Sequence, residues 1–573
     1  MDFIKSQEEK IKEVLNKIGY KVDYVKLNVS NMPELGDYQF NGVMPLAKEY
    51  HKNPREIAQE LVDNLDKSDY EKISVDGPGF INIKFSNDAL VNYFKTYNLK
   101  ECDKNNKTIV FDYGSPNVAK ALHVGHIRSI NIGEALKRLA NFLGYKTISD
   151  NYYGDWGRPM GLIILELKQA NPTWPFFDEN YTGEYPKITI TNEELETLYP
   201  IASQKAKEDE SYLEEARDIT ARLQRKERGI YALWEQIIEI SKESIRKLYG
   251  ELNATHDEEF GEAYSDNFVN DVVKFYKDNN LAYESQGALV VDIAKEDDKK
   301  EYPPAILVKS NGSVSYETTD LATIYDRVNR HKPNAIWYVV DNRQELHFEL
   351  VFRAAKKGIL KDKDTNLEFL GFGTINGNDG KPFKTRDGGV MTLENLLIQV
   401  KEEVSKNINP SYSDEVKKEI TQKLAIAALK YADLLPVRTT DYIFDIEKFC
   451  DLNGKTGVYL LYSIVRAKSL LNKASDINDS LIKINGTQDR DILVKLLQVD
   501  STLNKAFEEK SLSFITDYLY QLAKSYNSFY DANKVLIESD EELKQSWIYI
   551  TRKFVEVAST LTNIIAIDIP NKM

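Results

Sequence analysis

The stretch that decides the fold is Thr108–Ser129, TIVFDYGSPNVAKALHVGHIRS. It opens with TIVFDY (108–113), a short β-branched and aromatic run that predicts a buried strand. A turn rich in Gly, Ser, Pro and Asn follows, and then a helix from about 124 to 143 that Gly144 closes. The next strand is YKTISDNY (145–152). A strand, a helix and a second strand at this spacing predict a βαβ unit of a parallel sheet.

Outward from this unit the chain divides into three predicted domains. Residues 1–105 predict a small α+β domain with helices near 2–18 and 54–65, a strand at 80–86 and a polar linker at 101–107. Residues 106–394 predict an α/β domain with a Rossmann-type parallel sheet. Residues 395–573 have an almost entirely helical pattern and predict an all-α helix bundle.

The predicted Rossmann-type domain is interrupted. A long, charged and mostly helical stretch at about 160–250 is expected to be an insertion between two halves of the sheet. The second α/β half is expected to contribute strands near 288–293, 305–310 and 335–340.

Bulk composition limits the class of protein. The chain has 573 residues, a formal net charge of −15 and two cysteines, Cys102 and Cys450, which exclude a disulfide framework and a four-cysteine zinc site. The N-terminus has no apolar signal region and no run reaches the ~18 apolar residues of a membrane span, so we expect a soluble cytoplasmic protein without membrane contact. The acidic balance argues against nucleic-acid binding, although the distribution of charge matters more than its sum.

Two of the six histidines, His123 and His126, are three residues apart and are predicted to share one face of the first helical turn. Gly125 between them lets a flat ring approach the backbone. A helix N-terminus offers unpaired N–H groups to a phosphate. Two imidazole donors there stabilise charge developing on a phosphoryl group, by about 3 kcal/mol for each well-placed donor. The alternatives are histidines that only cap or pack the helix, and a zinc site, for which no third His or Cys lies close in sequence.

HVGH at 123–126 resembles the HIGH motif of class I aminoacyl-tRNA synthetases. The longer string SPNVAKALHVGHIRS (115–129) resembles the arginyl-tRNA synthetases in particular, in which Ser-Pro-Asn and Ala-Lys precede the motif. The resemblance implies catalytic roles for His123, Gly125, His126 and Lys120 within an ATP-binding segment. The residues of that segment are Pro116, Asn117, Val118, Ala119, Lys120, Ala121, Leu122, His123, Val124, Gly125 and His126.

KPFKTRDGGVMTLENLL (381–397) occupies the place of the second class I motif, KMSKS, which is absent here in its usual form. Many arginyl-tRNA synthetases have a string like FKTR-x-GG there. The resemblance therefore implies that Lys384 and Arg386 are catalytic cations, placed against the β- and γ-phosphates of ATP by a mobile loop with Gly388-Gly389. Lys120 is implied to compensate for the changed motif. The alternative is an ordinary basic surface hairpin.

An arginine pocket needs carboxylates, because a guanidinium is planar, always charged and presents a fork of donors. Asp112 closes the first strand, and Asp320 lies at a helix entry in SYETTDLATIYD, four residues after Tyr316. The alternative for either carboxylate is a helix cap or a surface ion pair. The residues that the resemblance assigns to arginine are Asp112, Ser115, Asn117, Tyr316, Asp320 and Gln344.

Within that set, the resemblance gives Tyr316 and Asp320 to the arginine side chain, with Asp112 helping. It gives the amino-acid end to Ser115, Asn117 and Gln344; the last lies in YVVDNRQELHF, where His347 is expected near the nucleotide.

Two regions resemble the RNA-binding parts of the same family. Residues 430–471 resemble its anticodon-binding bundle, through Phe444-Asp445, Gly454-x-Thr456-Gly457 and Tyr459-x-x-Tyr462. Unpaired RNA bases stack on aromatic side chains, but tyrosines at helical spacing are mostly core residues. GDYQFNGVMPLAK (36–48) resembles the additional domain that contacts the tRNA D-loop, which implies contacts by Tyr38, Gln39 and Asn41. The alternative there is a structured turn.

Taken together, the resemblance implies a ligase that activates L-arginine with ATP, as its Mg²⁺ complex, to arginyl-adenylate and transfers it to the 3′ end of tRNA(Arg). It also implies that adenylate formation needs bound tRNA. We expect a monomer with no resident metal and no DNA partner. The rivals are another class I synthetase, whose substrate lacks a cation, a catalytically silent RNA-binding paralogue, and a smaller HxGH nucleotidylyltransferase, which the length and the helical C-terminal region disfavour.

Overall fold

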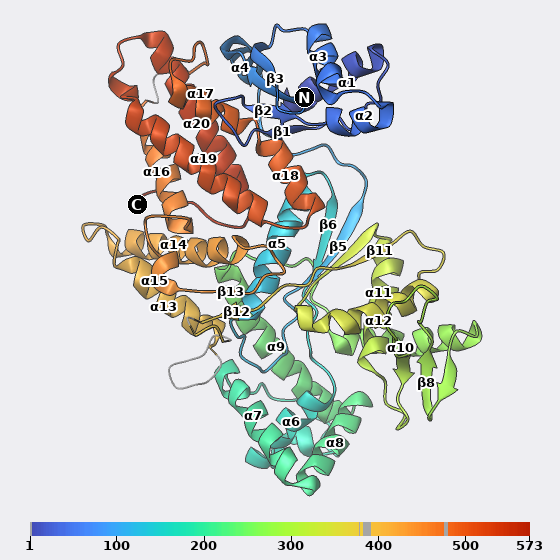
Figure 1. Cartoon of the computed structure of the whole chain (residues 1–573). Helices are drawn as coiled ribbons and strands as arrows, with labels where there is room; N and C mark the ends of the chain where they lie inside the picture. Colours follow the sequence, from blue (N-terminus) through green and yellow to red (C-terminus); the bar gives the residue numbers. More distant parts are fainter. Residues whose placement is uncertain (1–2, 378, 382–390, 475–478) are drawn as a thin grey trace.

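The computed structural model describes residues 3–377, 379–381, 391–474 and 479–573. At its centre is a four-stranded parallel sheet of order β11-β10-β5-β6 (Figure 1). Its strands are β5 (Thr108–Tyr113), β6 (Lys146–Asp150), β10 (Ala335–Val339) and β11 (Asn366–Phe369). The chain runs outward from β5 to β6 and, later, outward from β10 to β11 in the opposite direction. The sheet therefore has a topological switch point between β5 and β10, where α/β proteins bind ligands.

The predicted βαβ unit is confirmed, with α5 (His126–Phe142) between β5 and β6. Ile109, Phe111 and Tyr113 of β5 pack in one buried cluster together with α5. Val110 points to the other face, into a second buried cluster. Gly133 allows α5 to lie close to β5, because a Cβ at that position would be 2.2 Å from the ring of Tyr113.

Three helices cover that other face of the sheet, as the second buried cluster shows. They are α10 (Glu262–Asp278), α11 (Tyr316–His331) and α12 (Glu345–Lys357), and the short helix η2 (Asn342–Gln344) joins β10 to α12. Since helices lie on both faces, the strands of the sheet are buried on both sides and lack the alternation of polar and apolar residues.

One prediction about this domain was wrong. The runs near 288–293 and 305–310 form strands, but these strands belong to a separate antiparallel sheet of order β7-β8-β9 and not to the parallel sheet. Its strands are β7 (Tyr283–Ser285), β8 (Ala288–Val291) and β9 (Ala305–Val308). A short apolar run predicts a strand but does not determine its partner, which is a long-range choice.

The predicted helical insertion is confirmed and extends away from the sheet at the bottom of Figure 1. Its helices are α6 (Arg158–Ala170), η1 (Pro175–Phe177), α7 (Asn192–Glu208), α8 (Glu210–Gln224) and α9 (Arg228–Glu251). The indole N–H of Trp234 in α9 donates to the carbonyl oxygen of Asp155 at 2.7 Å, which ties the insertion to the segment after β6.

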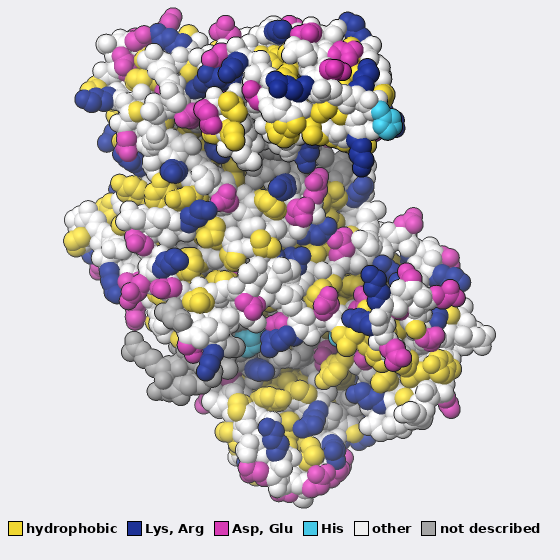
Figure 2. Space-filling view, in the orientation of Figure 1, with side chains coloured by type: hydrophobic (Ala, Val, Ile, Leu, Met, Phe, Trp, Pro, Cys, Tyr) yellow, Lys and Arg dark blue, Asp and Glu magenta, His cyan; other side chains and the backbone are white. Residues whose placement is uncertain are grey.

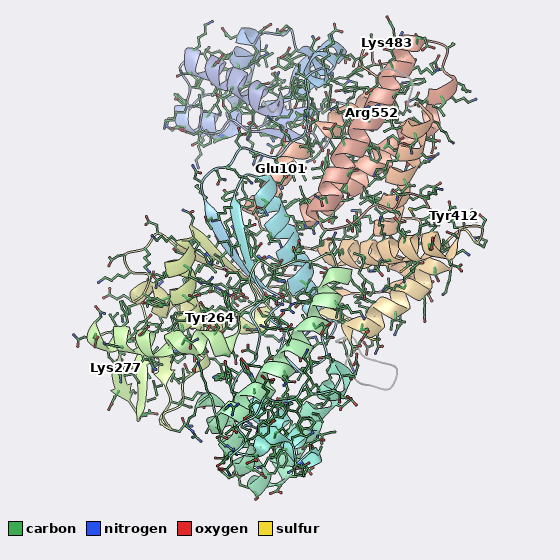
Figure 3. All side chains as sticks on the ribbon, turned by 180° about the vertical axis from the view of Figure 1, so that it is seen from behind. Glu101, Tyr264, Lys277, Tyr412, Lys483 and Arg552 are labelled. Atoms are coloured by element: carbon green, nitrogen blue, oxygen red, sulfur yellow. The ribbon has the colours of Figure 1, made fainter. Side chains whose placement is uncertain are left out.

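The N-terminal residues form a small α+β domain with an antiparallel sheet of order β1-β2-β4-β3. Its elements are α1 (Phe3–Lys17), β1 (Leu27–Val29), β2 (Tyr38–Phe40), α2 (Val43–Tyr50), α3 (Pro54–Asn64), β3 (Tyr70–Asp76), β4 (Phe80–Phe85) and α4 (Asn87–Phe94). Glu101, labelled in Figure 3, lies in the linker between this domain and the sheet. The predicted helices, strand and linker of this region are confirmed.

The C-terminal region is a helix bundle, as predicted. Its helices are α13 (Leu393–Ser405), α14 (Asp414–Leu434), α15 (Ile446–Phe449), α16 (Gly457–Lys473), α17 (Thr487–Leu496), α18 (Val499–Glu508), α19 (Ser513–Ala532), η3 (Val535–Ile537) and α20 (Glu541–Ile564). A two-residue strand, β13 (Tyr442–Ile443), pairs in parallel with β12 (Ile375–Asn376) and joins the bundle to the end of the α/β domain. Among the described residues, no helix is long and apolar enough to cross a membrane.

The N-terminal domain packs against the helix bundle (Figures 1 and 3). The guanidinium of Arg490 in α17 holds both carboxylate oxygens of Asp37, at 2.7 and 2.6 Å. Glu556 of α20 accepts a hydrogen bond from the backbone N–H of Leu99 at 3.1 Å. The partly buried, bidentate Arg490–Asp37 pair fixes the geometry of this junction more strictly than a single-contact surface ion pair does.

Candidate active site

The loop that follows β5 is held at the carboxyl edge of the sheet by backbone hydrogen bonds. The N–H of Val118 donates to the carbonyl of Gly154 at 3.3 Å, and the N–H of Gly154 donates to the carbonyl of Pro116 at 3.0 Å. The N–H of Ala119 donates to the hydroxyl of Ser241 in α9 at 3.0 Å. The loop is thus fastened both to the segment after β6 and to the helical insertion.

The two histidines lie together, but not as the sequence predicted. α5 begins at His126, whereas His123 precedes the helix and forms an antiparallel bridge with Thr392. Their imidazole ring centroids are 3.9 Å apart. The N–H of Gly125 donates to Nδ1 of His123 at 3.1 Å, and a Cβ on residue 125 would be 2.9 Å from that ring. The glycine is therefore needed because the imidazole of His123 lies over its backbone.

Both imidazoles are neutral at pH 7. Burial lowers the pKa of His126 to about 3, and the neighbouring His123 adds to this effect. Burial and then the charge of Lys120 lower the pKa of His123. Because Nδ1 of His123 accepts from Gly125, its proton is on Nε2, which leaves one N–H for a ligand. The exposed Lys120 supplies the positive charge that these neutral rings lack.

The start of α5 offers fewer free N–H groups than predicted. The N–H of His126 donates to the carbonyl of His123 at 2.9 Å, and the N–H of Ile127 donates to that of Val124 at 3.1 Å. The end of the helix therefore offers few free backbone donors, and the polar groups at this place are mainly side chains.

The HVGH segment (123–126) lies next to residues 391–393, which belong to the 381–397 segment. The N–H of Val124 donates to the carbonyl of Met391 at 3.1 Å, and the N–H of Leu393 donates to the carbonyl of Leu122 at 2.8 Å. The predicted cations Lys384 and Arg386, and the glycine pair, lie outside the described residues. On the face shown in Figure 2, a histidine and several Lys and Arg side chains gather where the sheet region meets the helical insertion.

The predicted carboxylate Asp320 lies in the second turn of α11 and contacts His347 of α12, with Oδ2 and Nε2 2.5 Å apart. Burial by itself lowers the pKa of His347, but the hydrogen bond to Asp320 and its charge raise it above the ordinary 6.5. Tyr316 begins α11 and is 68% exposed, and Gln344 at the end of η2 is also exposed. Both side chains are free to meet a ligand. Asp320 is thus no helix cap; it is half of an ion pair.

Asp112 forms an ion pair with an arginine of the chain itself. Its Oδ2 lies 2.7 Å from Nη1 of Arg327 in α11, and Arg327 also donates to Asp150 at 2.6 Å. The other oxygen of Asp112 accepts from the hydroxyl of Ser115 at 2.9 Å. Ser115 has a left-handed backbone, with φ of +40°, at the start of the loop. In this structure Asp112 therefore orients the loop.

Sequence reasoning missed two carboxylates near this site, Glu262, which lies close to Asp320, and Asp155, which lies close to Glu262. Burial, and then the charges of Asp155 and Asp320, raise the pKa of Glu262 to about 7. Burial raises the pKa of Asp155 to about 6, although Asp155 accepts from the N–H of Ala263 at 2.9 Å. Within the described part of the chain, no cation is paired with Glu262. A half-desolvated carboxylate beside two others favours a bound cation. Asp155 follows the end of β6 at the same sheet edge, and its position after a strand was the available signal.

The proposed RNA contacts of the N-terminal domain differ in exposure. Tyr38 is 2% exposed, and its ring packs on that of Phe85 with centroids 5.7 Å apart. Its side chain is therefore part of the domain core and does not present a face to a base. Gln39 and Asn41 are half-buried, and the amide of Gln39 donates to Asn82 at 2.8 Å. The side-chain oxygen of Asn41 is itself buried, so Gln39 and Asn41 are only partly exposed at this surface.

The tyrosines of the bundle are divided between the core and its edge: Tyr459 and Tyr530 are partly buried residues that pack against the core. Tyr518 and Tyr526 are buried, and Tyr526 stacks on Phe554 with ring centroids 4.0 Å apart. Tyr462 is 45% exposed. Among the described residues, no cluster of three or more His, Cys, Asp and Glu side chains is arranged to hold a metal ion.

Comparison with known proteins gives the family. The model described as the catalytic domain of class I tRNA synthetases (R) matches residues 88–446. The model of the arginyl-tRNA synthetase N-terminal domain matches residues 5–85, and that of the DALR anticodon-binding domain matches residues 460–573. The arginine–tRNA ligase of Alkaliphilus oremlandii is 43% identical, with 98% of each chain covered. The chain belongs to the arginyl-tRNA synthetases of class I.

Further relatives agree with this assignment. The arginine–tRNA ligase of Agathobacter rectalis is 41% identical to this synthetase, covering 99% of this chain and 98% of that one. The fold is shared with the arginyl-tRNA synthetases of Plasmodium falciparum, with a TM-score of 0.82 at 24% identity, and Thermus thermophilus, with 0.80 at 20%. Those alignments cover 100% of this synthetase and 99% and 100% of the two structures. The predicted family, fold class and ligase activity are confirmed.

Proposed function

We propose that this synthetase activates L-arginine with ATP, and transfers it to tRNA(Arg), through the residues gathered at the β5–β10 switch point. The observation that carries this is a pair of neutral histidines on one loop of that edge and a group of carboxylates on the helices across from it. The first suits the phosphates of ATP, and the second suits a guanidinium. A site for glutamate or glutamine has no use for such an acidic group.

On the nucleotide side, we propose that ATP binds along Pro116–His126 with its phosphates at His123 and His126. The arginine carboxylate attacks the α-phosphorus in line, the bond to the β-phosphate oxygen breaks, and pyrophosphate leaves. Nε2–H donors on the two imidazoles stabilise the charge of the transition state, which is worth about 3 kcal/mol per donor in such sites. Lys120, Lys384 and Arg386 hold the pyrophosphate. Mg²⁺ enters as part of the ATP substrate.

On the amino-acid side, we propose that Asp320 and Glu262 bind the guanidinium, with Tyr316 packed over it. Ser115, Asn117 and Gln344 bind the amino-acid end. Asp112 acts indirectly and does not contact arginine. Its ion pair with Arg327 and its hydrogen bond from the Ser115 hydroxyl shape the part of the pocket that binds the amino-acid end. No side chain acts as a nucleophile, because positioning and charge stabilisation are sufficient for adenylate formation.

For tRNA, we propose that Gln39 and Asn41 contact the D-loop and that the C-terminal bundle binds the anticodon. We propose domains at residues 1–105, 106–394 and 395–573; the β12–β13 pairing joins the last two. We also propose that one chain is sufficient for activity and that adenylate formation requires bound tRNA.

The test is transfer of radiolabelled arginine to purified tRNA(Arg) by the purified protein, with lysine, ornithine and citrulline as competitors. We expect charging with arginine that none of the three displaces at equal concentration, because a bidentate carboxylate site rejects analogues by about 10⁴–10⁵. Charging with another amino acid, or none by the folded protein, would refute the proposal.

A further inference from the structure

Arg128 is a buried cation close to the histidine pair that the reaction described above does not use. It is two residues after His126 in the first turn of α5 and is 1% exposed. Residues two apart on a helix do not face the same way, so its side chain points away from the ATP side. Its Nη1 donates to the carbonyls of Gly373 at 3.0 Å and Thr440 at 2.9 Å. Its Nε lies 3.0 Å from Oδ1 of Asp433 in α14.

Asp433, the partner of Arg128, is buried and fully engaged. Its Oδ2 accepts from the amide of Asn131 at 3.0 Å, and its Oδ1 accepts from the hydroxyl of Tyr442 at 3.1 Å. The guanidinium of Arg128 lies 5.1 Å from the centroid of the Tyr442 ring. Removing two charges from water costs several kcal/mol per ion, so a buried pair of this kind is weak evidence for stability. The Arg128–Asp433 pair instead fixes the relative position of α5 and α14 through several directional contacts.

The backbone segment around Gly373, whose carbonyl oxygen Arg128 binds, is connected at both ends to parts of the proposed active site. The N–H of Asn342, at the start of the turn that carries Gln344, donates to the carbonyl of Phe372 at 3.0 Å. After Gly373 come β12 and then the second motif, and the N–H of Tyr442 donates to Thr374 at 3.1 Å. Arg128 therefore connects the start of the His126 helix to the segment between the Gln344 turn and the second motif.

We propose that Arg128 and Asp433 are positioning residues, which hold the start of α5 and the segment 371–376 at the separation that adenylate formation requires. This proposal rests on the proposed function of the site. A displacement of about 1 Å between groups that act together on one transition state costs on the order of 10²-fold in rate. Because the contacts are shared between α5, α14 and β13, the helix bundle contributes directly to the geometry of the ATP site.

The test compares Arg128→Lys, Asp433→Asn and the double variant with Arg490→Lys. Lysine keeps the charge but lacks the fork of donors, so it cannot reach Asp433 and two carbonyls together. Arg490→Lys is the matched control, since Arg490 also forms an ion pair, with Asp37, between two domains; that pair is partly buried and remote from the histidines.

We expect kcat for arginine-dependent ATP–pyrophosphate exchange, measured with tRNA(Arg) present, to fall about 100-fold in Arg128→Lys, with KM for ATP and arginine within about threefold, because the groups that act on the transition state are displaced from one another. The double variant should be no slower than the slower single variant, because both residues act as one unit. Arg490→Lys should keep kcat within about twofold, because it alters no group that acts on the transition state. A kcat for Arg128→Lys within threefold of wild type, or a loss equal to that of Arg490→Lys, would overturn the proposal.

A second measurement separates this proposal from the proposed function. The imidazole ¹⁵N resonances of His123 and His126, assigned by single His→Asn variants, report their surroundings without any catalysis. We expect these resonances to shift in Arg128→Lys and to stay unchanged in Arg490→Lys. If the wild-type protein showed no exchange in the presence of tRNA(Arg), the proposed function would fail, and unshifted resonances in Arg128→Lys would then refute the positioning role by themselves.

Discussion

At the scale of single residues, the site combines neutral histidines with excess negative charge. Burial keeps His126 neutral, with a pKa of about 3, while Glu262 has a pKa of about 7 next to Asp320. Neutral imidazoles donate hydrogen bonds without attracting a counter-ion before ATP arrives. Closely spaced carboxylates are destabilised until a cation binds. Each group is thus prepared for its ligand by the environment that the fold imposes.

The first prediction concerns His126. His126→Ala should lower kcat for arginine activation about 10²–10³-fold, because one hydrogen-bond donor to the developing charge is lost. Since its pKa is about 3, His126 stays neutral from pH 6 to 8, and its contribution should not titrate there. The measurement is the kcat ratio of wild type to variant across that range. His51→Asn, at an exposed helix end, is the control and should leave kcat unchanged. A ratio that collapses below pH 6.5 would contradict a neutral donor.

The second prediction concerns the pH dependence of arginine binding. Below its raised pKa, His347 is protonated and occupies Asp320, so arginine must displace it. As pH rises, His347 becomes neutral, and Glu262 ionises near pH 7. Both changes favour a bound guanidinium, so KM for arginine should fall between pH 6 and 8.5. Combining His347→Asn with Glu262→Gln should flatten that dependence. A KM that rises with pH would contradict these roles.

The third prediction is a charge-matched comparison of two aspartates. Asp320→Asn should raise KM for arginine about 10- to 100-fold, because a charged hydrogen bond to the guanidinium, which contributes about 1.5–3 kcal/mol, is lost. Asp271→Asn, on the exposed side of α10, changes the net charge equally and should leave KM unaltered. Equal effects in both variants would show a general field effect and not a specific contact.

At the scale of elements, local patterns were predictable from the sequence and long-range partners were not. The β5–α5–β6 unit follows from apolar periodicity and a closing glycine within one short stretch. His123 lies outside the helix because its backbone pairs with Thr392, which no local pattern reveals. Glu262 approaches Asp320 only through the packing of α10 on α11. By contrast, the burial of Tyr38 was predictable, since alternate residues of a strand share a face and Phe40 is apolar.

The fourth prediction tests the attachment of α11 to the sheet. Arg327→Met should destabilise the protein by about 3–5 kcal/mol, because Asp112 and Asp150 remain as buried, uncompensated charges. The measurement is the shift of the urea unfolding midpoint. Arg246→Met removes a partly exposed pair with Glu259 and should change stability by less than about 1 kcal/mol. Similar shifts for the two variants would show that the Arg327 pair has no special role.

At the scale of the whole molecule, three regions with separate family matches are joined by specific ion pairs. Arg490 and Asp37 join the N-terminal domain to the bundle, and Arg128 and Asp433 join the bundle to the catalytic helix. The net charge of −15 did not predict an RNA ligand, because RNA binding depends on local surfaces and not on the sum of charges. In Figure 1 the N-terminal domain and the helical insertion lie at opposite ends of the molecule, with the sheet between them, so the proposed role of this domain concerns binding and not chemistry.

The fifth prediction follows from that separation. Gln39→Ala should raise KM for tRNA up to about tenfold, the value of one hydrogen bond, and leave KM for arginine unchanged. Gln59→Ala, on the exposed surface of α3 in the same domain, is the control of equal size. Steady-state charging at varied tRNA concentration distinguishes them. A changed KM for arginine would contradict a role limited to tRNA binding.

The central claim is tested most directly by arginine-dependent ATP–pyrophosphate exchange, measured with and without tRNA(Arg). We predict exchange that requires arginine, appears only when tRNA is present, and is lost in His126→Ala. Exchange with arginine alone would retain the active site and remove the requirement for tRNA. No exchange under either condition, by a folded protein that still binds tRNA, would contradict the account and indicate a catalytically silent RNA-binding paralogue.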